Sequence, residues 1–243
     1  MRLKLLLPVL ALGMVSPAYA DWTGKGEAGL VISSGNTETE TANVKFDMAH
    51  EAEKWKHAFG LSGLYASDEE GTTAQRWEAH AQSDYNFSPK TFWFGAGRYE
   101  DDRFSGFEYQ ATISTGLGRK FIDNDRTKFV GTAGVGYKVF ETRDAFDDAG
   151  VLIEEGARED DIVFRGTLDF EHKFTETTTL IDKFILEAGA DNTYYQNDLA
   201  LQVKMTEVLA LAVGYSVRHN TDPPLGFEKT DTLTTVNLVY EIK

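Results

Sequence analysis

The chain of 243 residues contains no cysteine. We therefore expect neither stabilising disulfides nor the cysteine-linked lipid of a lipoprotein. Long apolar runs are also missing, because beyond the N-terminal segment no stretch approaches the roughly 20 apolar residues that a membrane-spanning helix requires. Basic residues are scarce, with 24 Lys and Arg against 39 Asp and Glu and a formal charge of −15. This balance argues against nucleic acid as a partner, since phosphate binding depends on basic patches.

The first 20 residues have the order of a secretory signal peptide. Arg2 and Lys4 precede the apolar run LLLPVLALGMV, and Ala18-Tyr19-Ala20 forms a small-x-small cleavage site. We expect residues 1–20 to be cleaved during export. No linker or compositional break interrupts residues 21–243, which we expect to form one domain.

Strict alternation of apolar and polar residues recurs along almost the whole of this domain. The segment RWEAHAQSDYNF, residues 76–87, is an example, with Trp77, Tyr85 and Phe87 on its apolar parity. Period two indicates a β-strand, and about twelve segments have the length of a tilted membrane strand. The sequence therefore predicts an all-β fold, a transmembrane antiparallel up-and-down β-barrel of about 12 strands. In Thr91–Glu100 the three successive aromatic residues FWF leave open which alternate residues point into the barrel.

The connections between these segments alternate in length, which favours a membrane barrel over a soluble β-sandwich. Short periplasmic turns and longer extracellular loops are typical of outer-membrane barrels, and aromatic residues gather near the predicted periplasmic strand ends. The short connections are residues 51–54, 88–90, 122–126, 175–178 and 206–207, and the longer ones are 67–73, 100–107, 141–160 and 220–231.

The polar parity of the predicted strands would line the lumen. It carries both signs of charge in comparable number, so we do not expect a filter of one sign. About twelve strands should leave a narrow polar passage, between the filled interior of eight strands and the open channel of sixteen. The lumen-lining residues on which we place most weight are Arg76, Glu78, His80, Asp84, Arg165, Asp169, Glu171, Lys173 and Arg218.

Patterns that could carry chemistry are weak. GKGEAG at residues 24–29 matches the dinucleotide string but lacks the preceding strand and following helix, and the five histidines are scattered over several strands. The acidic loop 141–160 does not have EF-hand spacing, which leaves weak divalent bridging to lipopolysaccharide or a plain solvated loop. We therefore predict no catalytic residues, no cofactor and no dedicated metal site.

Several loop and strand-end motifs resemble one known family, the salt-induced outer-membrane proteins, a domain family of unknown function. The motifs are SGNT at 34–37, DRFSGFEYQ at 102–110, RHNTDPP at 218–224, KTDT at 229–232 and LVY at 238–240. The resemblance implies residence in the outer membrane of a Gram-negative bacterium and an association with salt or osmotic response, and it names no reaction. Its loop residues are Ser34, Gly35, Asn36, Asp102, Arg103, Phe104, Asn220, Asp222 and Pro223.

Three functions stay open at this point. The favoured one is a narrow polar channel for small solutes or ions. The second is a closed barrel with an envelope-structural or adhesive role through its acidic loops, and the third is a barrel enzyme. We expect a monomer, reaching the outer membrane through the periplasm, whose partners are membrane lipid, lipopolysaccharide and the barrel-assembly machinery.

Overall fold

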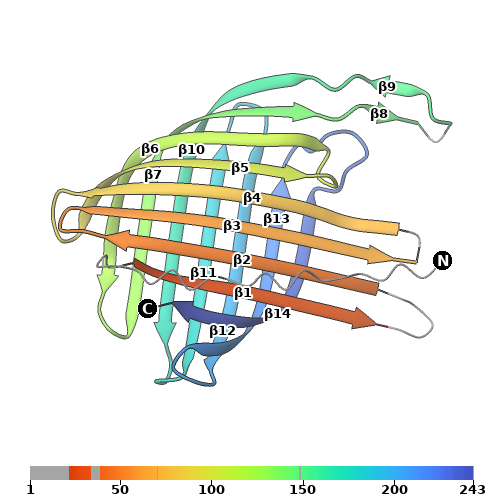
Figure 1. Cartoon of the computed structure of the whole chain (residues 1–243). Coiled ribbons are helices and arrows are strands. Elements are labelled where there is room, and N and C mark those ends of the chain that lie inside the picture. Colours follow the sequence, from red (N-terminus) through yellow and green to blue (C-terminus); the bar gives the residue numbers. More distant parts are fainter. Residues whose placement is uncertain (1–21, 34–38, 70, 148, 243) are drawn as a thin grey trace.

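The computed structural model describes residues 22–33, 39–69, 71–147 and 149–242 (Figure 1). In this part of the chain, no helix is long and apolar enough to cross a membrane. The predicted signal peptide lies outside the described residues. Twelve long strands form one sheet: β1 Trp22–Ser33, β2 Thr39–Glu51, β3 Trp55–Asp68, β4 Gly71–Asn86, β5 Thr91–Asp102, β6 Phe107–Asp123, β7 Thr127–Thr142, β10 Arg158–Lys173, β11 Thr178–Ala188, β12 Thr193–Lys204, β13 Leu209–Asn220 and β14 Thr230–Ile242.

The sheet closes on itself into a barrel in which every strand pairs antiparallel with its neighbours. The first and last strands meet along a register that runs from Gly24 opposite Ile242 to Ala28 opposite Leu238. Closure leaves no free edge, which is how a β-sheet satisfies its backbone hydrogen bonds in lipid. The predicted all-β barrel of about twelve strands is confirmed.

The two rims of the barrel differ in the connections that they carry. At one rim, here called the turn rim, the strands are joined by residues 52–54, 87–90, 124–126, 174–177 and 205–208. The start of β1 and the end of β14 also meet there. The opposite end, the loop rim, carries residues 103–106, 189–192, 221–229 and the long segment between β7 and β10.

The outer face is apolar, with aromatic contacts near both rims. Trp55 and Tyr85 lie with ring centroids 5.0 Å apart near the turn rim. Trp77 and Tyr99 do the same at 4.9 Å towards the loop rim. These positions match the two aromatic girdles that flank the apolar band of outer-membrane barrels.

The burial of its side chains shows which residues of β5 point into the barrel. Phe92 and Phe94 are 3% and 0% exposed and point into the barrel, whereas Trp93 is 38% exposed on the outer face. Gly118 lies opposite Phe92 in β6, and a Cβ there would overlap the phenyl ring. A glycine at this position therefore makes room for an aromatic side chain inside the lumen.

The acidic loop 141–160 is more ordered than the plain solvated loop considered above. It holds a short hairpin of β8 Ala145–Phe146 and β9 Leu152–Glu154, which extends beyond the loop rim (Figure 1). The carboxylate of Asp147 accepts hydrogen bonds from the backbone N–H groups of Ala149 and Val151 and closes the turn. These bonds satisfy polar backbone groups within the hairpin itself.

Successive residues of β14 point alternately to the outer and inner faces of the barrel. Arginine substitutions at two adjacent positions should therefore differ in their cost to stability. Val236 is 48% exposed on the outer face at the middle of the strand, and Thr235 points inward beside Gly214. We expect Val236→Arg to lower the free energy of unfolding by roughly 2–4 kcal/mol, because lipid does not solvate a guanidinium, and Thr235→Arg to cost less than about 1 kcal/mol. Denaturant unfolding of the barrel in lipid vesicles measures both values.

Val236→Ala is the matched control, since it removes the valine side chain without adding charge. Equal costs for Arg at positions 235 and 236 would contradict the assignment of inner and outer faces.

Candidate permeation pathway and its charged layer

The inward faces of the strands enclose a cavity of about 270 Å³, here called the lumen cavity. Asp84, Glu171 and Lys173 have the inward parity but lie nearer the turn rim and do not line this cavity. The other predicted lumen residues line it: Arg76, Glu78, His80, Arg165, Asp169 and Arg218.

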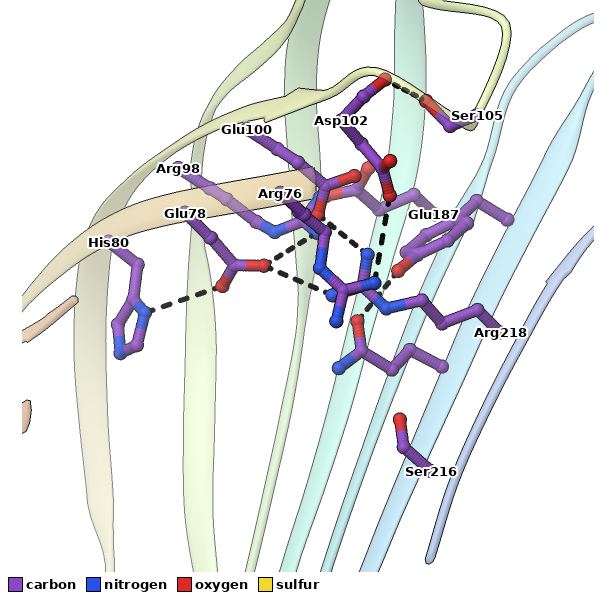
Figure 2. Close-up of polar contacts among 12 residues, drawn as sticks. Arg76, Glu78, His80, Arg98, Glu100, Asp102, Ser105, Glu187, Ser216 and Arg218 are labelled. Carbon is purple, nitrogen blue, oxygen red and sulfur yellow. Dashed lines mark hydrogen bonds and ion pairs between the residues drawn. The ribbon is translucent and has the colours of Figure 1, made fainter. Parts of the chain in front are cut away.

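An ion pair crosses the lumen between opposite walls (Figure 2). Arg218 on β13 places Nη1 2.8 Å from Oε2 of Glu100 on β5, and Nη2 3.5 Å from Oε2 of Glu78 on β4. Five strands separate β13 from β5 in either direction round the barrel, so these two strands face each other. The long arginine side chain therefore reaches across the lumen to the opposite wall.

Arg98 joins the two carboxylates on its own side of the lumen. Its Nη2 lies 2.6 Å from Glu100 and 2.9 Å from Glu78. His80 extends the group, with Nδ1 3.5 Å from Glu78 and Nε2 3.8 Å from Asp47. Two arginines and two glutamates thus alternate in space, which is the arrangement that charge-assisted hydrogen bonds favour.

A second group of ions fills the neighbouring part of the cross-section. Glu187, which is 1% exposed, lies between Lys138 and Arg165, with both nitrogen–oxygen distances 3.5 Å. The ring of Tyr194 joins the two groups, because Arg98 and Lys138 each lie 5.5 Å from its centroid. We call the following seven residues the charged layer: Glu78, Arg98, Glu100, Lys138, Arg165, Glu187 and Arg218.

The charged layer combines three carboxylates with four cations, and some of its polar atoms make no hydrogen bond to any residue that the structure describes. The Nε atoms of Arg98 and Arg218 and both carboxylate oxygens of Glu187 are buried without a hydrogen-bond partner among the described residues. Removing one member of a buried ion pair is costly, so each charge depends on its neighbours. Electrostatic attraction, more than a saturated hydrogen-bond network, therefore holds the layer together.

A second cavity, of about 220 Å³, lies at the loop rim and is here called the vestibule. Arg76 and Arg218 line both the vestibule and the lumen cavity. The two cavities therefore meet at these side chains, near the charged layer. A solute that passed through the barrel would cross from one cavity to the other at this point.

The structure brings several of the family-motif residues to the loop rim. Asp102 and Phe104 line the vestibule, and Arg103 donates a hydrogen bond to Gln75. In the loop 221–229, the backbone N–H of Asp222 bonds to Asn192, whose side chain also bonds to Asn220. Pro223 lies in the same loop, whereas Ser34, Gly35 and Asn36 lie outside the described residues.

Arg98 and Glu100 are absent from the lumen residues predicted above, although both belong to the charged layer. In β5 the run FWF left open which alternate residues point into the barrel, because three successive aromatic residues suit either face. Arg98 and Glu100 are two residues apart and flank Tyr99, and this pattern of two charges around an aromatic residue indicates the inward parity. It also places Phe92 and Phe94 inside the barrel.

The described residues hold no cluster of three or more His, Cys, Asp or Glu side chains able to bind a metal ion. The dinucleotide-like string at residues 24–29 lies within β1, paired with β2 along its whole length, so it is not a phosphate-binding loop. Of the five histidines only His80 has the inward parity. The polar side chains that line the lumen cavity are mainly charged and amide groups.

Solved structures and a sequence relative match this chain over most of its length. An outer-membrane channel from Pseudomonas putida F1 matches with a TM-score of 0.52 and 9% identity, covering 93% of this chain and 97% of that one. The NanC porin matches with a TM-score of 0.51 and 11% identity, covering 91% and 100%. At these identities the likeness shows the fold alone, that of an outer-membrane barrel. The uncharacterised protein YdiY of Escherichia coli K12 is 26% identical over 235 residues, covering 94% of this chain and 87% of that protein.

One family model covers nearly the whole barrel, residues 26–242, and is described as "Protein of unknown function, DUF481". The match begins within β1 and ends at the last residue of β14. The chain belongs to this family of outer-membrane barrels.

Proposed function

We propose that this barrel is a narrow channel for small polar solutes or ions, in which the charged layer is the constriction. The observation that carries the proposal is the ion pair between Glu100 and Arg218, which crosses the lumen between two cavities. A barrel of twelve strands is wider than the side-chain-filled barrels of eight and narrower than an open porin of sixteen. A constriction made of movable side chains fits that intermediate width.

The pairing of the layer sets the kind of selectivity that we infer. Both signs of charge face the pathway, so neither cations nor anions meet a ring of opposite charge. A solute gains most by exchanging with a pair, offering a carboxylate to an arginine or an ammonium to a glutamate. Small polar solutes are therefore favoured over large or apolar ones.

The fold likeness supports a channel, because the two structural neighbours are an outer-membrane channel and a porin. We infer that the loop rim faces outward and the turn rim faces the periplasm, as in other outer-membrane barrels. Export through the periplasm, insertion by the barrel-assembly machinery and contact with lipopolysaccharide belong to this proposal. The association with salt response stays a prediction from the family resemblance.

Neutralising the bridging carboxylate tests the constriction. Glu100→Gln leaves the guanidinium groups of Arg98 and Arg218 facing each other across a neutral amide. We expect a higher single-channel conductance than in the wild type and a reversal potential shifted in the direction of anion selectivity. We also expect the free energy of unfolding to fall by about 1–3 kcal/mol. Planar bilayer recordings in a salt gradient measure the first two.

Glu176→Gln is the matched control, because Glu176 lies exposed in a turn of the turn rim. It should leave conductance and reversal potential unchanged. Absence of any conductance from both the wild type and Glu100→Gln, in preparations that run as folded barrels before heating, would rule out the channel.

The projecting hairpin favours a second candidate, attachment to a partner at the cell surface. Phe146, Val151, Leu152 and Ile153 are between 48% and 61% exposed beyond the loop rim. Acidic residues flank this apolar group on both strands. Exposed apolar patches with a polar border are typical of binding surfaces.

Replacing residues 145–154 with a short Gly-Ser linker separates the two candidates. We expect the barrel to keep its stability within about 0.5 kcal/mol, because the hairpin strands pair only with each other. Conductance should also persist, which bilayer recording checks. A large loss of stability or of conductance would show that the hairpin serves the channel rather than a separate attachment.

A further inference from the structure

One loop at the edge of the vestibule, residues 103–106, supplies Phe104 to its lining and contacts a loop from a distant part of the chain. Gly106 ends the loop after β5 with a φ of +80°, which favours glycine, and a Cβ there would lie 2.7 Å from Phe227 and 2.9 Å from Pro224. The loop 103–106 therefore packs closely on the loop 221–229. Asp102 stabilises the first loop by accepting a hydrogen bond of 3.0 Å from the backbone N–H of Phe104. The loop that supplies Phe104 to the vestibule is thus held by its own hydrogen bond and by packing on a second loop.

Arg76 supplies the vestibule with a guanidinium that has spare donors. Among the described residues its one ion pair is with Asp102 at 3.6 Å, which is too long for a hydrogen bond. Arginine carries five N–H donors, so most of those on Arg76 are unused. Arg218 differs, because Glu100 and Glu78 already hold its two terminal nitrogens. Arg76 is therefore the group best able to take a carboxylate from solution.

Asp231 supplies the same cavity with an unused carboxylate. It is exposed, lines the vestibule and lies opposite Arg218 in the pairing of β13 with β14, yet it forms no ion pair within 4.0 Å in the described part of the chain. The ring of Phe104 lines the same cavity and is 42% exposed. A carboxylate and an aromatic face together favour a cationic group.

The remaining surfaces define the body of the ligand. Leu64 on β3 lies opposite Arg76, and Leu233 follows Asp231 by two residues on β14. Both leucines line the vestibule. The cavity of about 220 Å³ is smaller than the pockets that take drug-sized ligands. It therefore suits a compact molecule with a short apolar part.

We propose that the vestibule binds a small zwitterion of amino-acid type, with its carboxylate on Arg76, its ammonium near Asp231 and Phe104, and its apolar side chain against Leu64 and Leu233. This inference rests on the proposed channel, for which it names a class of solute held just outside the charged layer. Neither a simple anion nor a simple cation uses both charged groups. The site is thus selective for molecules that carry both charges.

Isothermal titration calorimetry on the full barrel, refolded in detergent, tests the site without requiring transport. The probes are leucine, 4-methylpentanoate, which lacks the ammonium group, and 3-methylbutylamine, which lacks the carboxylate. We expect leucine to bind at least tenfold more tightly than either single-charge probe, which corresponds to about 1.4 kcal/mol. No detectable leucine binding, or equal binding of 4-methylpentanoate, would overturn the proposal.

Two substitutions with matched controls assign the contacts. We expect Arg76→Gln and Asp231→Asn each to weaken leucine binding roughly tenfold or more. Only Arg76→Gln should weaken 4-methylpentanoate, and only Asp231→Asn should weaken 3-methylbutylamine. Arg126→Gln and Asp125→Asn make the same changes at the turn rim, outside both cavities, and should leave leucine affinity unchanged.

Migration on an unheated gel confirms that each variant is folded. Unchanged leucine affinity in folded Arg76→Gln and Asp231→Asn would also overturn the site. Conductance without leucine binding would overturn the proposed binding site but not the channel. Leucine binding without conductance would support the binding site and overturn the channel.

Discussion

The closed ring of backbone hydrogen bonds is the constraint on which the rest of this structure depends. Hydrocarbon offers no hydrogen-bond partners, so a sheet that spans a membrane must have no free edge. Pairing of β1 with β14 from Gly24 opposite Ile242 supplies the last seam. Once the ring is closed, every residue is assigned to lipid or lumen, because a slip of one residue would exchange the two faces.

Closure has a second consequence, since it gathers the charges of twelve strands into one narrow space. Buried charges are stable only beside opposite charges, and the charged layer meets this requirement through pairs between strands that are not hydrogen-bonded to each other, such as Arg218 with Glu100 and Lys138 with Glu187. The same pairs obstruct the passage. The charged side chains make the lumen polar, but their ion pairs also occupy its cross-section. A polar interior therefore does not by itself mean an open pore.

The charged layer and the vestibule differ in how completely their charges are used. In the charged layer Glu100 and Arg218 hold each other, whereas at the loop rim Arg76 and Asp231 keep free hydrogen-bonding capacity. Both of these groups line the vestibule. The proposed binding site and the charged layer thus lie at adjacent levels, and Arg218 lines both cavities.

Local patterns in the chain were sufficient for the barrel, its strand number and the apolar faces of most strands, because alternation with period two is a property of neighbouring residues. They failed in β5, where three successive aromatic residues concealed the parity that places Arg98 and Glu100 in the lumen, and in the loop that forms the β8–β9 hairpin. Only the tertiary structure decided which charges meet. Arg218 and Glu100 are 118 positions apart in the chain, and their contact depends on barrel width and register, which no single strand encodes.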